Sequence, residues 1–245
     1  MTSKLLQRLL IAVSAVAPLC VSLESPAQTT SAASTGNSAV ATPVYQPPLR
    51  GTTAGGRIGG GSRGTGEQAI TVSVLAPGHP GRTLSGHPRL YWFLSDRVDI
   101  PIEVTLVDKH SSDPLLALTI SPPVERGIHA LDLERQGVRL ESDVRYEWFV
   151  ALVPDPDQRS RDIVAGAEIE RVTPPPGLAD KLAAAGREGG PVVYAQAGIW
   201  YDAMDAVSMQ IEQRPADPVY REHRAALLDQ VGLEHVAAYD RSLAP

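Results

Sequence analysis

Apolar and polar side chains alternate in seven short runs between residues 70 and 172, and Pro, Gly and Asp residues separate the runs. A period of two turns one face of each run toward a core and the other toward solvent, which is typical of β-strands. Seven such strands predict a mainly β fold, an antiparallel sandwich of the immunoglobulin or fibronectin type III kind. The expected strands are 70–75, 90–94, 100–106, 116–120, 131–133, 144–152 and 163–169.

Two runs predict more than a strand. Residues 90–94 are nearly all apolar, which indicates a central strand buried on both faces. Tyr146 follows Leu140 by six residues at the start of the sixth run, a spacing that resembles the tyrosine corner of fibronectin type III domains. A tyrosine corner predicts a hydrogen bond between the phenol and upstream backbone, whereas the alternative is a plain core tyrosine. Trp148 lies on the same face and is expected in the core.

The hydrophobic period becomes helical after three consecutive prolines, 174–176, which remove amide donors and end the sandwich. A short helix over 178–185 is expected to stop at the glycine pair 189–190. Apolar residues then recur every three or four positions over 193–211 and predict one helix with a single apolar stripe. Asp217 and Pro218 fit the N-cap and first position of a last helix, which Gly232 would close.

Gly198 leaves two interpretations open. The segment 194–203 resembles the middle of a tetratricopeptide repeat, in which Gly198 would be the turn between two antiparallel helices. A single copy has no stacking neighbours, however, and the apolar phase runs through the glycine unbroken. We therefore expect one continuous helix, with an internal glycine that costs about 1 kcal/mol.

The N-terminal region has the pattern of an export signal. Residues 1–27 contain two basic residues, an apolar stretch and a small-residue cleavage pattern, and a retained membrane anchor is the alternative. Residues 28–68 are rich in Ser, Thr, Ala, Gly and Pro, which predicts a disordered tether. We expect the sandwich to span 69–173 and a small C-terminal α-helical subdomain to span 174–245. The expected location is the periplasm or the cell exterior, with no membrane contact after signal cleavage.

Composition excludes several classes of function. Cys20 is the only cysteine and lies within the expected signal, so the mature chain would lack disulfides, thiolate catalysis and cysteine zinc sites. The formal net charge of −6 gives no electrostatic basis for binding nucleic acid. The six histidines show no metal-ligand spacing, so no metal site is expected.

A glycine-rich run at 59–64 fits both G-x-G-x-x-G and G-x-S-x-G. The first pattern needs a preceding strand and a following helix, and the second needs a strand-to-helix elbow. The expected tether before the run and strand after it provide neither context. We therefore expect no cofactor.

Five segments together resemble the bacterial family called domain of unknown function 928, over residues 57–240. They are 59–64, 146–149, 167–172, 194–203 and 227–233. Members of that family carry a cysteine shortly after the sixth strand, where this chain has Val153 and Pro154. The resemblance implies an exported bacterial protein and supplies no activity. It also suggests a use for Arg57 and Arg63, such as docking the tether.

Two groups of residues are candidates for binding. The first is the loop after the sixth strand, with Asp155, Asp157, Arg159 and Arg161. The two arginines would neutralise a calcium site, so we expect a solvated hairpin loop, with a protein-binding loop as the alternative.

The second group surrounds Trp200, which lies on the apolar stripe and is expected to be buried. Tyr201 and Asp202 face elsewhere and could form a small site at the junction of sandwich and helices, near Arg171.

These observations favour a non-catalytic protein-interaction module whose partner is another exported or envelope protein. One alternative is a hydrolase, for which the junction should hold a deep cleft with Asp202 buried beside a base. The other is a carbohydrate-binding module, which needs a row of exposed aromatic side chains among the three Trp, seven Tyr and two Phe residues. The sequence leaves the oligomeric state and the biological process open.

Overall fold

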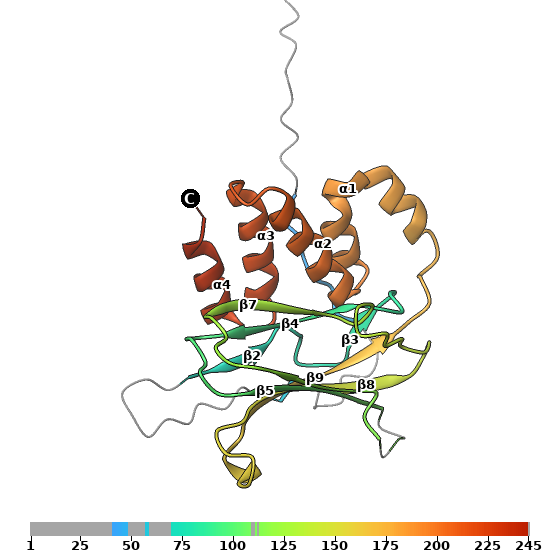
Figure 1. Ribbon diagram of the computed structural model, residues 1–245. Helices are drawn as coiled ribbons and strands as arrows, with labels where there is room; N and C mark the ends of the chain where they lie inside the picture. Colours follow the sequence, from blue (N-terminus) through green and yellow to red (C-terminus); the bar gives the residue numbers. More distant parts are fainter. Residues whose placement is uncertain (1–40, 49–56, 59–69, 109–110, 112, 245) are drawn as a thin grey trace, which may run out of the picture. The chain divides into compact units, whose positions relative to one another are not determined.

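The computed structural model describes residues 41–48, 57–58, 70–108, 111 and 113–244. Apart from one short 3-10 helix, strands come first along the described chain and four α-helices follow (Figure 1). The strands are β1 (Arg57–Ile58), β2 (Val72–Val74), β3 (Gly81–Thr83), β4 (Arg89–Leu94), β5 (Ile102–Asp108), β6 (Leu116–Ile120), β7 (Gly127–Asp132), β8 (Arg145–Leu152) and β9 (Ile163–Arg171). The helices are the short 3-10 helix η1 (Arg159–Arg161), then α1 (Leu178–Gln196), α2 (Trp200–Gln213), α3 (Pro218–Asp229) and α4 (Glu234–Ser242).

The strands form two sheets. The larger has the order β1-β9-β8-β5-β6 with β3 also paired to β9, and the smaller has the order β2-β4-β7. The expected β-rich fold with two sheets and a helical C-terminus is confirmed, and each of the seven predicted runs contains a strand. The prediction of a seven-strand, wholly antiparallel sandwich is wrong, because β1 and β3 are additional and β3 pairs with β9 in parallel. These two strands have two and three residues, which is too short for a period of two to be recognised.

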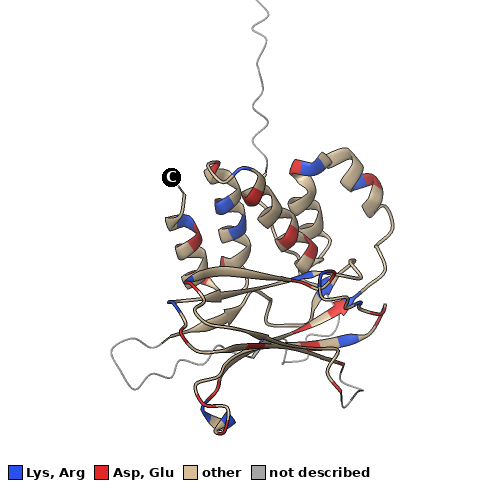
Figure 2. Ribbon diagram, in the orientation of Figure 1, with Lys and Arg blue, Asp and Glu red and all other residues tan. Residues whose placement is uncertain are grey.

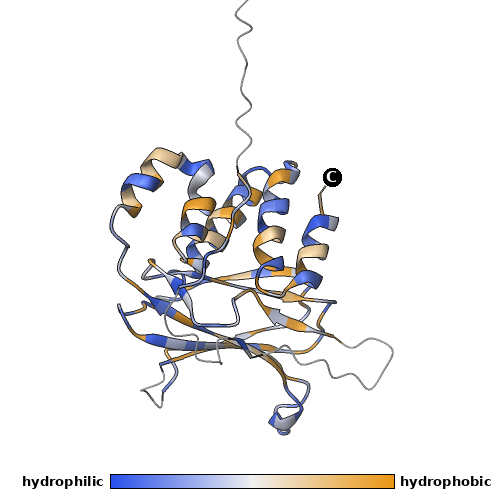
Figure 3. Ribbon diagram, turned by 180° about the vertical axis from the view of Figure 1, so that it is seen from behind, coloured by the Kyte–Doolittle hydropathy of each residue, from blue (hydrophilic) through white to orange (hydrophobic). Residues whose placement is uncertain are grey.

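The smaller sheet lies between the larger sheet and the helices (Figure 1). Helix α2 contacts both β3 and β4. Because the smaller sheet is covered on both faces, β4 buries every residue after Arg89, as its apolar sequence predicts. Hydrophobic and hydrophilic residues alternate along the helices, as the view from behind shows (Figure 3).

One core joins the sheets to the helices. Trp148 and Trp200 are fully buried, as expected. The indole Nε1 of Trp200 donates to the carbonyl of Leu75, 2.9 Å away, and thereby ties α2 to the end of β2. The described residues all belong to one compact unit, Ala39–Pro245. The boundary expected between residues 173 and 174 is therefore a change of secondary structure within a shared core.

The tyrosine corner has the expected hydrogen bond. The amide of Glu141 donates to the phenol oxygen of Tyr146 at 3.0 Å. This contact fixes the chain where it enters β8, and Tyr146 itself is buried.

The prediction of one helix through Gly198 is wrong. Gly198 has φ +73 and separates α1 from α2, as in the repeat-like alternative. A Cβ atom at this position would lie 2.8 Å from the carbonyl oxygen of Gln46, so both the backbone conformation and the close approach require glycine. The apolar spacing hides this turn because both helices bury their apolar faces in the same core.

The remaining helix predictions differ in detail from the structure. Helix α1 is kinked at Gly186, with φ +63, three residues before the expected break at 189–190. The cap of α3 is confirmed, since the carboxylate of Asp217 accepts from the amide of Val219 at 3.1 Å. Helix α4 was not predicted, because it is short and carries few apolar residues.

Two segments of the expected tether are attached to the fold. The amide of Gln46 donates to the carbonyl of Ala195 at 3.0 Å, and the guanidinium of Arg57 donates to the carbonyl of Val231 at 3.1 Å. Residues 41–48 and 57–58 therefore contact the folded chain. Besides these polar contacts, Tyr45 is buried in the core and packs edge-on against Trp200, with ring centroids 4.9 Å apart. The expected signal (1–27), the glycine run (59–64) and the rest of the tether lie outside the described residues. Among the helices that are described, none has the length and apolarity needed to cross a membrane.

Candidate functional site

The loop after β8 carries mixed charges that pair with one another. Its residues 153–162, with η1 inside, extend from the larger sheet away from the helices (Figures 1 and 2). Arg159 contacts Glu103 at 2.9 Å and Asp162 at 2.8 Å. Arg161 lies 4.0 Å from Asp155, and Asp157 is exposed. Within the described part of the chain, no group of three or more His, Cys, Asp or Glu side chains is arranged to hold a metal ion.

A cavity of about 220 Å³ lies between the β3–β4 connection and α2. We call it the acidic cleft. It contains two of the predicted site residues, Tyr201 and Asp202, but not Arg171, which donates to the carbonyl of Leu140 at 2.9 Å. The lining residues are Thr83, Ser85, His87, Pro88, Arg89, Tyr194, Tyr201, Asp202, Asp205, Ala206 and Met209.

Asp202 connects α2 to the β3–β4 connection. Its Oδ2 accepts from the amide of Leu84 at 3.0 Å, and its carboxylate is also hydrogen-bonded by the side chain of Thr83. Burial raises the pKa of Asp202 to about 6, although these two hydrogen bonds oppose the increase. The charge of Asp202 therefore changes closer to neutral pH than that of an ordinary aspartate.

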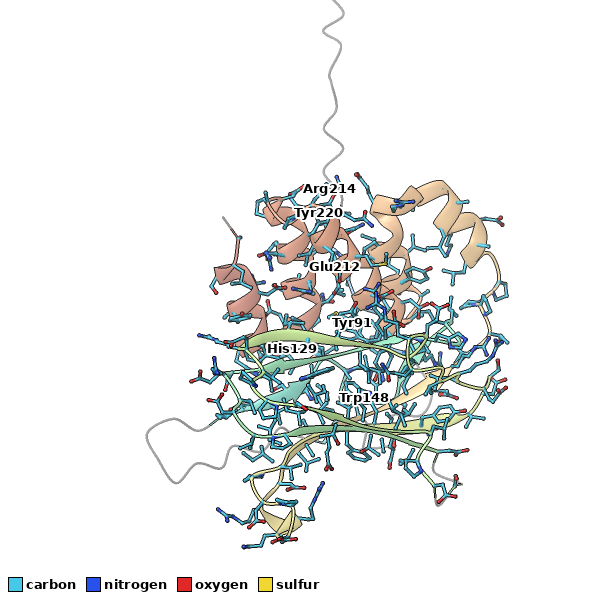
Figure 4. The ribbon with its side chains drawn as sticks, in the orientation of Figure 1. Tyr91, His129, Trp148, Glu212, Arg214 and Tyr220 are labelled. Carbon is cyan, nitrogen blue, oxygen red and sulfur yellow. The ribbon has the colours of Figure 1, made fainter. Side chains whose placement is uncertain are left out.

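Asp205, one helical turn further along α2, is the second carboxylate of the cleft. The phenol of Tyr91 donates to its Oδ1 at 2.8 Å, and Nε of Arg89 lies 3.6 Å from the same oxygen. Burial raises the pKa of Asp205, while the Tyr91 hydrogen bond and the Arg89 charge lower it. Tyr91 lies between the smaller sheet and the helices (Figure 4).

Tyr201 forms the closed floor of the cleft. Its hydroxyl accepts from Nε1 of Trp148 at 2.9 Å and donates to the carbonyl of Glu168 at 3.1 Å. Because Tyr201 is only 2% exposed, these bonds inside the core occupy the hydroxyl. Gly81 makes room for the ring, since a Cβ atom there would lie 2.6 Å from its Cε2.

His87 has one tautomer fixed by its neighbour. Its Nδ1 lies 2.7 Å from the carbonyl of Val138, which can only accept, so Nδ1 carries the hydrogen and Nε2 is the basic nitrogen. Sequence reasoning missed His87 and Arg89, because nothing near them in the chain marks a site. It also missed Asp205, although the spacing of three from Asp202 on a predicted helix was a usable signal.

A larger cavity of about 570 Å³ continues from the acidic cleft between α1 and α2. We call it the apolar groove. Tyr194, Ala206 and Met209 line both cavities. The kink at Gly186 lies in its wall. The other lining residues are Leu182, Ala183, Arg187, Gly190, Gln210 and Gln213.

The molecule is thus a two-sheet β protein with a C-terminal helical layer and a two-part cavity at their junction. The family model described as Domain of Unknown Function (DUF928) matches residues 58–240. The chain belongs to this family. The description assigns the family no activity.

No curated protein matches the chain. One similar solved structure is a multi-domain immunophilin from Arabidopsis thaliana, at 9% identity, covering 72% of this chain and 94% of that chain. The TM-score is 0.16, so this similarity supports neither a shared fold nor a shared function.

Proposed function

We propose that this protein is an exported, non-catalytic interaction module whose ligand site is the acidic cleft together with the apolar groove. One observation carries the proposal. Asp202 and Asp205 are held by groups in the opposite wall, Leu84 and Tyr91, and a cavity remains open beside them. A preformed, mostly apolar cavity with a few fixed polar groups is the usual form of a ligand site.

The strand order supports the module part of the proposal. The smaller sheet, β2-β4-β7, and the four strands β9-β8-β5-β6 of the larger sheet correspond to the A-B-E and G-F-C strands of an immunoglobulin or fibronectin-type sandwich, with β6 as an added strand. Many cell-surface binding domains have this architecture. The export part rests on the pattern of residues 1–27, and the partner would be another exported or envelope protein.

Site-specific photo-cross-linking tests the location of the site. A photoreactive amino acid replaces Met209, a residue that is 38% exposed and lies where the two cavities meet. The matched control replaces Val219 on α3, which is 43% exposed and lines neither cavity. Each full-length protein is irradiated with an envelope extract.

We expect an adduct from position 209, and none of the same mass from position 219. Adding Ala206→Trp, which fills the cavity at the shared wall, should remove that adduct. An adduct that persists with the cavity filled, or that forms equally from position 219, would contradict the proposed site.

A hydrolase is the second candidate, and two observations favour it. The junction holds a cleft in which Asp202 is buried with a pKa of about 6, whereas the alternative asks for a deep cleft with a base beside Asp202. His87, with a basic Nε2, lines the same cleft. A carboxyl group with a pKa near neutral, such as Asp202, suits general acid–base catalysis. Turnover of ester, peptide or glycoside substrates that falls at least a hundredfold in Asp202→Asn would replace the binding proposal with this one.

The carbohydrate-binding alternative has less support. All Trp, Tyr and Phe residues lie in the described part of the chain, and each is buried or half-buried. The row of exposed aromatic side chains that this alternative needs is therefore missing from the surface.

A further inference from the structure

Six residues on one face of α2 line the two cavities in order. They are Asp202, Asp205, Ala206, Met209, Gln210 and Gln213, at helical spacings of three and one. At 1.5 Å of rise per residue, the face spans roughly 16 Å, which is the length of about five residues of extended peptide.

The acidic end of this face has more carboxylates than cations. Arg89 lies 3.6 Å from Asp205 and 3.4 Å from Glu212. The same guanidinium also lies 3.9 Å from Asp132. Among the residues that line the acidic cleft, Asp202 and Asp205 are the carboxylates and Arg89 is the one Lys or Arg side chain. Figure 2 shows the acidic residues on α2. The excess of negative charge fits a basic side chain of a ligand.

The opposite end carries a positive charge. Arg187 is exposed, lines the apolar groove and forms no ion pair within the described part of the chain. A carboxylate of a ligand could pair with its guanidinium. Between the two ends, Ala206 and the flexible, exposed Met209 provide an apolar middle.

Gln210 fixes the wall of the apolar groove where α2 packs against α1. The residue is 97% buried, and its Nε2 donates to the carbonyls of Arg187 and Glu188, both at 3.1 Å. These two bonds fix the orientation of the amide, so Oε1 is the remaining acceptor. That oxygen has no hydrogen-bond partner among the described residues. Because this oxygen is shielded from solvent, Gln210 contributes a fixed wall to the groove and no exposed hydrogen-bond acceptor.

We propose that this face of α2 binds an extended peptide segment of a partner protein, with a basic side chain in the acidic cleft, an apolar side chain beside Met209 and a carboxylate at Arg187. The proposal rests on the proposed function, because it names the ligand of the same site.

Peptide binding measured by fluorescence anisotropy tests this order of charges. Three labelled, end-capped pentapeptides are compared on the full chain: Arg-Ala-Leu-Ala-Glu, Arg-Ala-Leu-Ala-Arg and Glu-Ala-Leu-Ala-Glu. We expect the first to bind about fivefold tighter than either of the others, because only it pairs with both ends of the groove.

Reversing one protein charge should reverse the preference. In Arg187→Glu, the Arg/Arg peptide should bind about fivefold tighter than the Arg/Glu peptide. Arg161→Glu, in the loop after β8, is the matched control and should keep the wild-type preference. Equal affinities for all three peptides, or a preference that Arg187→Glu leaves unchanged, would overturn the inference.

The two proposals fail separately. If position 209 still forms an adduct that Ala206→Trp removes, while no peptide preference is found, the ligand site stands and the peptide inference is wrong. If that adduct proves to be a glycan or a lipid, the peptide inference is likewise wrong.

Discussion

Asp202 is subject to opposing effects on its charge. Burial disfavours the carboxylate, while the amide of Leu84 and the side chain of Thr83 hydrogen-bond to it. Burial is the larger effect, and the pKa rises from the usual 3.8 to about 6. The side chain that joins the β3–β4 connection to α2 is therefore also the one whose charge changes just below neutral pH.

Replacing Asp202 by Asn should change how stability depends on pH. The folded state holds the Asp202 proton more tightly than the unfolded chain, so the wild type loses unfolding free energy as pH rises from 4 to 8. The loss from this group is about 2 kcal/mol. Asparagine does not titrate. The unfolding free energy of Asp202→Asn, relative to that of the wild type, should therefore rise by that amount as pH rises from 4 to 8. Urea unfolding at several pH values measures it, and parallel curves for the two proteins would contradict the assignment.

Asp240 differs from Asp202 in its partners, because it is completely buried and its partners are the cations Arg221 and Arg224. Its two oxygens lie 2.7 Å from Nε and Nη2 of Arg224, and Nη1 of Arg221 lies 3.1 Å from Oδ1. Asp240→Asn removes the charge and leaves two guanidinium groups packed around a neutral side chain. We expect a loss of about 3–5 kcal/mol in unfolding free energy.

Glu222 provides the control for Asp240, because it joins the same two helices at the surface. It pairs with Arg241 at 2.8 Å, with both side chains more than a third exposed. Glu222→Gln should cost at most about 1 kcal/mol. Chemical denaturation of both variants makes the comparison, and similar losses would show that the Asp240 network contributes no more than a surface pair.

At the scale of elements, the turn between α1 and α2 depends on Gly198. Gly198→Ala should destabilise the protein by about 2 kcal/mol or more, because alanine is strained at φ +73 and its Cβ would meet the Gln46 carbonyl oxygen. Gly137 is the matched control, with φ +69 and nothing within 4 Å of a Cβ, so Gly137→Ala should cost only about 1 kcal/mol. Thermal unfolding of both variants measures the difference. Equal losses of stability in the two variants would mean that the approach of the new Cβ to the Gln46 carbonyl adds nothing to the cost of the strained backbone.

The elements also show what the sequence could predict. The nearly continuous apolar run at 90–94 identified the burial of β4, and the spacing of Tyr146 from Leu140 identified its hydrogen bond. Alternation identified the seven strand regions, because it depends only on neighbours within a few positions. It missed β1 and β3, which pair with β9 at a distance in sequence. It missed the Gly198 turn because the apolar spacing continues across it.

The candidate site was predictable only in part, for the same reason. Tyr201 and Asp202 stood out on the helix that carries them. Their partners Trp148 and Leu84 lie 53 and 118 positions away in the chain. Contacts across such separations come from the packing of sheet against helix, which no local pattern records.

At the scale of the whole molecule, Arg57 connects three regions of the chain. Arg57 lies in β1, which pairs with β9. Its guanidinium donates to the carbonyls of Ala76, Val231 and Gly232 at 3.2, 3.1 and 3.4 Å. Burial lowers the pKa of Arg57, and the charge of Glu234 partly offsets this effect. The docking role suggested for Arg57 by the family resemblance fits these contacts, whereas Arg63 lies outside the described residues.

Arg57→Ala should therefore loosen contacts far apart in the sequence. We expect a loss of about 1–3 kcal/mol in unfolding free energy, since three carbonyls lose a shared donor. Backbone amides of β9 and of the α3–α4 turn should exchange faster with deuterium. Arg57→Lys keeps the charge but has a single ammonium in place of the planar fork, and should recover only part of the loss. If faster exchange were confined to residues next to position 57, the connecting role of Arg57 would be contradicted.

The location of the ligand site is tested most directly by hydrogen–deuterium exchange of the full chain with and without the ligand captured at position 209. The account predicts slower exchange in 187–196 of α1 and 202–213 of α2, and no change in the loop 153–162. Slower exchange in that loop, with α1 and α2 unchanged, would contradict it.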